Sequence, residues 1–281
     1  YLDFHQTIIE WSCIFTEEYF MTNLEDPKVK EATPEGHLNK LSEEQIISQL
    51  LENAPSIEEI PVDLPSKNKF YNLEDSGKPI TIRPMTFQDE RAMMSNKNVN
   101  IDILNVLLSR CVSNISIGNL LQIDKLYILI KLRELSYGDE YNATIPCTSC
   151  RRDNSVAFKM SKLHVNYIED DATNPFELTL PIINKTVKVK FPRVEDESYF
   201  SNADNVIANL WRFVEEIEGF SSPSLISKVI PSLPLKDAHA LLQAVSGNKY
   251  GVDTKVRFIC NYCSHNEIME MPISTDFFTE S

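Results

Sequence analysis

Two fifteen-residue stretches, SYGDEYNATIPCTSC at 136–150 and KYGVDTKVRFICNYC at 249–263, share a Tyr-Gly pair and end in a Cys-x-x-Cys motif. The pair and the motif keep the same spacing in both stretches. Two residues between a pair of cysteines let both thiolates point at one ion, and two such knuckles complete a tetrahedral site. The sequence therefore predicts one shared metal site whose ligands are Cys147, Cys150, Cys260 and Cys263.

The predicted ion is a structural Zn²⁺, because four thiolates leave no open position for a catalytic water. An iron–sulfur cluster and a redox disulfide are the alternatives, and a thioredoxin-like motif would need a βαβ setting that is absent here. The segment 151–259 between the motifs far exceeds the usual ribbon spacing of about 15 to 20 residues. Two copies of one unit, each supplying one knuckle, would explain this distance. His265 is a candidate for an alternative ligand or for a donor to a ligand, but an exposed turn residue is its simpler interpretation.

Landmarks upstream of the knuckles also favour a tandem duplication. Asp124 and Asp237 precede apolar runs, and each lies at the same distance from the knuckle of its own half. Ile80–Arg83, followed by Gln88-Asp89-Glu90, matches Val187–Lys190, followed by Glu195-Asp196-Glu197, at a slightly smaller offset, so the second copy has a short insertion. Coincidence between two short helix-to-ribbon patterns is the alternative.

The predicted fold class is α+β, with hairpin–helices–knuckle units at 66–172 and 173–281 joined by the shared four-cysteine zinc ribbon. Each unit is expected to open with a β-hairpin. The expected hairpin strands are 70–73 with 80–83, and 176–180 with 187–191.

Helices are expected after each hairpin, because apolar residues recur at helical spacing over 101–112 and 207–217. Asp124 and Asp237 are expected to be N-cap residues of the helices that follow. The acidic pair Asp89-Glu90 follows a predicted strand, where carboxylates at helix starts are common, so a catalytic role for the pair is disfavoured.

Residues 1–65 are predicted to form an acidic N-terminal arm and linker. Their net charge is −11, whereas the rest of the chain carries only −3. Apolar spacing predicts helices over 8–19 and 41–51, the second capped by Ser42 with Gln45 three residues later. A solvated tail is the alternative, but the many aromatic residues favour an arm that docks on a partner.

Composition excludes several classes of protein. The chain has 281 residues, enough for about two domains, and is 42% hydrophobic and 24% charged. Its net charge of −14 disfavours binding to nucleic acid. It has no apolar run that could span a membrane and no signal peptide, so we expect the protein in the cytosol of the cell that makes it. It also lacks the common nucleotide-binding, metalloprotease and nucleophile-elbow motifs, and we do not expect an enzyme.

The sequence resembles the T4-type bacteriophage baseplate hub protein family over roughly residues 66 to 280. The residues that carry the resemblance are DKLYILIKLRE at 124–134, SYGDEY at 136–141, the two Cys-x-x-Cys motifs and Phe277-Phe278. The resemblance leads us to expect Gly or Pro after each knuckle, whereas Arg151 and Ser264 stand there.

The resemblance implies a structural or assembly role at the baseplate centre of a contractile phage tail. The implied partners are other baseplate, hub and tape-measure proteins, and the implied location is the virion, with the host cytoplasm during assembly. The alternative from another class is a zinc-ribbon protein of a transcription or replication complex, which a basic face would favour. An enzyme comes third, and a pocket with convergent polar groups would favour it.

Overall fold

The computed structural model describes residues 42–50, 58–72, 78–95, 103–200, 203–246, 249–273 and 275–278. The chain divides into two compact units, residues 1–55 and 56–281. In the first unit, helix α1 (Glu43–Leu50) has the predicted cap, because the Ser42 amide donates to Gln45 Oε1 at 2.9 Å and the Gln45 amide donates to Ser42 Oγ at 3.3 Å. The helix predicted at 8–19 lies outside the described residues.

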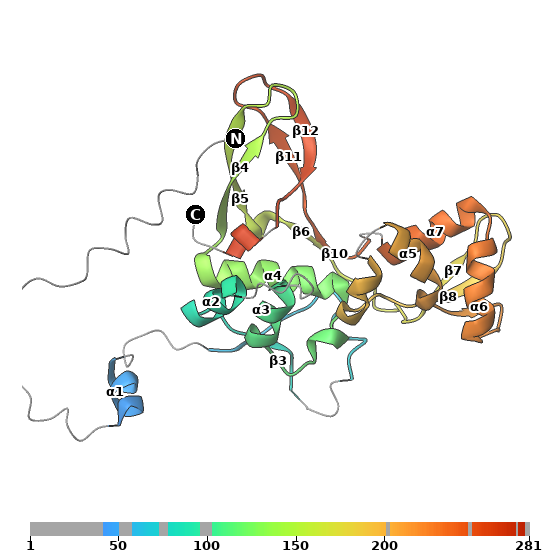
Figure 1. The fold of residues 1–281 in the computed structure, drawn as a ribbon, viewed down its shortest axis with the longest axis horizontal. Helices are drawn as coiled ribbons and strands as arrows, with labels where there is room; N and C mark the ends of the chain where they lie inside the picture. Colours follow the sequence, from blue (N-terminus) through green and yellow to red (C-terminus); the bar gives the residue numbers. More distant parts are fainter. Residues whose placement is uncertain are drawn as a thin grey trace, which may run out of the picture. The chain divides into compact units, whose positions relative to one another are not determined.

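Residues 56–281 have a mixed α+β fold of small antiparallel sheets and helices, so the predicted class is confirmed at this level (Figure 1). The first elements along the chain are β1 (Ile60–Pro61), β2 (Thr81–Ile82), α2 (Phe87–Ser95), α3 (Ile103–Cys111), β3 (Val112–Ser113) and α4 (Gln122–Tyr137). The three strands form one sheet in the order β1-β2-β3. Helices α2 and α3 lie between β2 and β3 in the sequence, and α4 follows β3.

A second sheet has the same antiparallel order, β7-β8-β9, and lies among three further helices. Its first two strands form the predicted hairpin, with Phe176 paired to Val189 and Thr179 to Thr186. The elements are β7 (Phe176–Thr179), β8 (Thr186–Val189), the 3₁₀ helix η4 (Val194–Phe200), α5 (Ala203–Asn209), β9 (Val214–Ile217), α6 (Pro223–Val229) and α7 (Leu235–Ser246).

The knuckles stand at the tips of two further hairpins, which lie side by side in Figure 1. One consists of β4 (Glu140–Pro146) and β5 (Asp153–Lys159), and the other of β11 (Lys255–Ile259) and β12 (Asn266–Glu270). At their base, β6 (His164–Asn166) pairs with β10 (Gly251–Asp253) in a strand pair that links the two halves of the sequence.

Three local predictions are wrong. The partner of β2 is Ile60–Pro61 and not 70–73, whose first residues lie in a turn and a bend. Helix α5 ends at Asn209, and the rest of the helix expected at 207–217 is a 3₁₀ turn at Leu210–Phe213 followed by strand β9. The N-caps predicted at Asp124 and Asp237 are the third error: the N-cap of α4 is Leu121 and α7 begins at Leu235, so both aspartates lie within the first turn of their helix.

Two hydrophobic cores stabilise residues 56–281 through apolar burial. The first contains the apolar residues of α4 together with residues of both knuckle hairpins, and it includes Phe277 and Phe278. The second lies between the β7-β8-β9 sheet and helices α6 and α7. The residues of the C-terminal knuckle therefore belong to the first core, although their nearest upstream helix, α7, belongs to the second.

The same hydrogen bonds recur in the two halves of the sequence. The carboxylate of Asp124 accepts from the amide of Ser66 at 2.9 Å, and that of Asp237 accepts from the amide of Ile182 at 2.7 Å. Each carboxylate thus joins the first turn of a helix to an upstream segment of the same half. Gly138 and Gly251 also share an unusual backbone conformation, with φ of 89° and 92°.

Candidate metal centre

Each knuckle is a tight turn between two antiparallel strands. In the first, the Cys147 amide donates to the Arg152 carbonyl at 3.0 Å, and the Arg151 amide donates to the Cys147 carbonyl at 2.9 Å. Arg151 has a φ of 60°, the left-handed conformation for which glycine is the usual residue. The second knuckle has the same two bonds and the same conformation, formed by Cys260, Ser264 and His265.

The four predicted cysteines lie together. Their sulfurs are all within 4.8 Å of one another, which is close enough to hold a metal ion. The closest pairs join the two knuckles, with Cys147 Sγ 3.7 Å from Cys263 Sγ and Cys150 Sγ 3.6 Å from Cys260 Sγ. These distances far exceed a disulfide bond of about 2.05 Å. They match the edge of about 3.8 Å that a tetrahedral ion with Zn–S bonds near 2.3 Å would set.

Contacts outside the sulfurs also join the knuckles. The amide of Asn261 donates to Asn154 Oδ1 at 2.9 Å, while Asn154 itself donates to the Arg152 carbonyl and is almost completely buried. The Arg152 guanidinium lies over the Tyr262 ring, 5.2 Å from its centroid. The two tips are therefore held together by polar contacts as well as by their cysteines.

The environment of Cys260 favours its thiolate form, which is the form that binds metal. Burial alone would raise the pKa of Cys260, but hydrogen bonds from the backbone amides of Tyr262 and Cys263 and from neighbouring thiols lower it to about 6. Cys260 and Cys147 are buried, whereas Cys263 is exposed. The site therefore has an inner side against the first core and an outer side that faces solvent.

Other residues considered from the sequence lie outside this cluster. His265 is half-buried and lies 3.8 Å from the Glu267 carboxylate, and it does not belong to the group of four ligand atoms. Cys111 is buried in the first core, as its place on an apolar helix face predicts. Cys13 lies outside the described residues.

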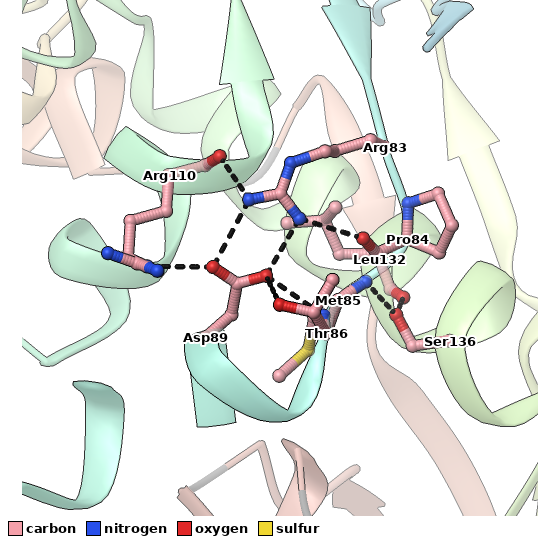
Figure 2. Close-up of polar contacts among 8 residues, drawn as sticks. All are labelled: Arg83, Pro84, Met85, Thr86, Asp89, Arg110, Leu132 and Ser136. Carbon is pink, nitrogen blue, oxygen red and sulfur yellow. Dashed lines mark hydrogen bonds and ion pairs between the residues drawn. The ribbon is translucent and has the colours of Figure 1, made fainter. Parts of the chain in front are cut away.

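The acidic pair Asp89-Glu90 belongs to the start of α2, as predicted, but Asp89 has a larger role (Figure 2). The side chain of Asp89 is fully buried and accepts hydrogen bonds from Arg83 at 2.7 and 3.1 Å and from Arg110 at 2.7 Å. It also accepts from the amide and hydroxyl of Thr86 at 2.8 and 2.7 Å. Asp89, in α2, therefore links the residue that follows β2 to α3.

These contacts determine the charge of the group. Burial alone would raise the pKa of Asp89, but the hydrogen bonds from Arg83, Thr86 and Arg110 outweigh it and hold that pKa well below its usual range. The carboxylate is ionised, and each of the hydrogen-bond partners named above is a donor. Such charge-assisted hydrogen bonds stabilise the fold. Sequence patterns did not identify Arg83 and Arg110 as its partners, because Arg110 is 21 residues away from it.

The fold is that of an α+β protein in which two hairpin tips bring four cysteines close enough together to hold a metal ion. A family model described as T4 bacteriophage base plate protein matches residues 57–279. The chain belongs to this family, and it is accordingly a structural component of a phage baseplate. Its location is the tail baseplate of the virion, and its partners are other baseplate proteins. Searches of curated proteins and of solved structures found no match.

The structure also bears on the membrane prediction. In the part of the chain that the structure describes, no helix combines the length and the apolar character needed to cross a bilayer.

Proposed function

We propose that this protein is a non-catalytic component of the baseplate hub, at the centre of a contractile phage tail, where it binds hub and tape-measure proteins. The observation that carries the proposal is the family match over 57–279, which includes both knuckles. The resemblance of residues 124–141 to hub proteins supports the finer placement. The net charge of −14 supports protein partners over nucleic acid, and it disfavours the transcription or replication alternative.

We further propose that the cluster of Cys147, Cys150, Cys260 and Cys263 binds one structural Zn²⁺. The cross-knuckle sulfur distances of 3.6 and 3.7 Å support tetrahedral coordination, and four thiolates leave no position for a reacting water. An ion there would close the long loop between the two motifs and so couple metal binding to folding. Elemental analysis of the purified protein, with titration of released zinc, tests the identity of the ion.

The recurrent geometry supports an internal duplication, with an acidic arm at 1–65 and units at 66–172 and 173–281, where the first unit also recruits strand β1 (Ile60–Pro61) from the end of the arm. The two three-stranded sheets have the same order, the paired aspartates make the same kind of contact, and the knuckles repeat bond for bond. In this proposal the zinc joins the ends of the two copies, and the acidic arm provides a further docking segment for a partner.

Quantitative mass spectrometry of purified phage particles and of tail-assembly intermediates tests the hub proposal. A fixed, low copy number in mature particles, with release together with hub proteins on tail dissociation, is expected for a hub subunit. Presence in intermediates alone would instead indicate an assembly factor that acts in the host cytoplasm. Release with peripheral baseplate proteins would place the protein in the baseplate but would contradict the hub location.

A further inference from the structure

A large cavity lies in residues 56–281, away from the cysteine cluster. It has a volume of about 1000 Å³ and is bounded by the first turns of α4, the second half of α7, strand β7 and the segment 249–252, which includes the start of β10. This volume lies at the upper end of the range for ligand-binding sites in proteins, and it is larger than an incidental solvent-filled gap.

The walls of the cavity are mainly apolar and only half-buried. Helix α7 buries Leu241 in the second core, while Ala240 and Ala244, one turn apart, line the cavity. Ile123 and Leu126 line it from α4. Two helices of different cores therefore present apolar side chains to one space that no described side chain fills.

Aromatic side chains continue the apolar surface from β7 toward β10. The rings of Phe176 and Phe191 have centroids 4.9 Å apart, and that of Tyr250 lies 6.0 Å from Phe191. All three are half-buried and line the cavity. Exposed aromatic surface of this kind is typical of the anchoring part of a protein interface.

Four of the five charged residues that line the cavity are acidic. Glu197 pairs with Lys125 at 2.6 Å, and Glu169 pairs with Lys249 at 3.0 Å. Asp171 and Glu177 are exposed, and neither forms an ion pair with any residue that the structure describes. The cavity therefore combines an apolar interior with carboxylates at its rim, which are available to cationic groups of a partner.

We propose that this cavity docks an amphipathic helix of a partner protein, with apolar residues on one face and Lys or Arg beside them. The small side chains of Ala240 and Ala244 let a helix axis approach α7 closely, and ridges-into-grooves packing places such axes about 8–10 Å apart. A second copy of this chain is disfavoured by its net charge of −14. That the helix belongs to a baseplate protein rests on the proposed function, whereas the groove and its specificity do not.

The experiment uses the full chain and a fluorescent Leu/Lys peptide of about 16 residues, which is long enough for about four helical turns. We expect saturable binding with a gain of helical circular dichroism, and at least about tenfold weaker binding by D171K/E177K, because reversal adds repulsion to the loss of attraction. Filling the cavity with A244W should weaken binding to a similar degree. The matched control E215K/E270K makes the same charge change at exposed residues outside the cavity and should retain the affinity.

Three outcomes would overturn the proposal. Equal weakening by the cavity and control double variants would indicate attraction to the net charge alone. Unchanged affinity in A244W would place the peptide outside the cavity; if A244W lowers the melting temperature, A240W serves instead. Binding without a gain of helicity would indicate an extended segment, added to the open edge of β7. Because the peptide assay needs no phage, its failure is distinct from failure of the baseplate-hub proposal.

Discussion

Replacing Asp89 by asparagine tests the buried ion network, because the substitution removes the charge while it keeps the size of the side chain. The five hydrogen bonds to this carboxylate include three from guanidinium groups. Removal of one partner from a buried ion pair costs about 3–5 kcal/mol. Here the cost is lower, because the side chains of Arg83 and Arg110 are 23% and 38% exposed and can regain water. We expect D89N to lose about 2–3 kcal/mol of unfolding free energy.

Asp196, the counterpart of Asp89 in the second half of the sequence, provides the matched control. It accepts a hydrogen bond from the Arg193 amide at 2.9 Å, three residues before it, as Asp89 does from the Thr86 amide. It forms no ion pair with any described residue. D196N should therefore cost only the weakening of a cap, about 0.5–1 kcal/mol. Urea unfolding with an unchanged m value measures both variants.

The pH dependence gives a second test with a defined sign. Since the pKa of Asp89 is lowered by folding, its contribution is complete above the unfolded pKa of about 3.9 and is lost as the pH falls toward the folded pKa. The difference in stability between wild type and D89N should stay constant from about pH 5 to 8 and shrink below about pH 4. A loss in D89N below about 1 kcal/mol, or an equal loss in D196N, would refute the role given to the two arginines.

Three further predictions concern the knuckles and the glycines. C147S should lose bound metal and cooperative folding together, as measured by elemental analysis and thermal melting, and a stable metal-free variant would contradict a structural site. R151G should gain about 1 kcal/mol in urea unfolding, because Arg151 has a φ of 60°, and a loss would show that its side chain outweighs the backbone strain. G251A should lose about 1 kcal/mol more than G138A, because both have positive φ but only the Cβ at 251 would meet a backbone oxygen of α4, at 3.1 Å; equal losses would contradict this close approach.

The parts of the fold that the sequence predicts well are those set by local chemistry. The Cys-x-x-Cys motifs identify the four residues whose sulfurs gather within 4.8 Å. The Ser42–Gln45 cap and the 176–189 hairpin follow in the same way from residues near one another in sequence. In each case, a few neighbouring side chains and one spacing carry the information.

Non-local pairing was not predictable in this way. Strand β1 consists of Ile60–Pro61, and a two-residue strand that contains proline has no alternation to distinguish it from a linker. Its pairing with β2 depends on the sheet that β3 completes only after α2 and α3. Likewise, the arginine partners of Asp89 come from the position just after β2 and from α3, and only the folded chain brings them together.

The sequence pattern identified Asp124 and Asp237 as important residues but predicted the wrong contact for them. A helix-start aspartate suggests an N-cap, but Asp124 and Asp237 are each fully buried and bind backbone amides of an upstream segment. An ionisable side chain is seldom buried without hydrogen-bond partners, so an aspartate beside an apolar run needs donors from elsewhere in the fold. Tyr71 supplies a further donor to Asp124 at 2.5 Å, which a simple cap would not require. Recurrence of such an aspartate in both halves is therefore a stronger indication of a tertiary anchor than of a helix cap.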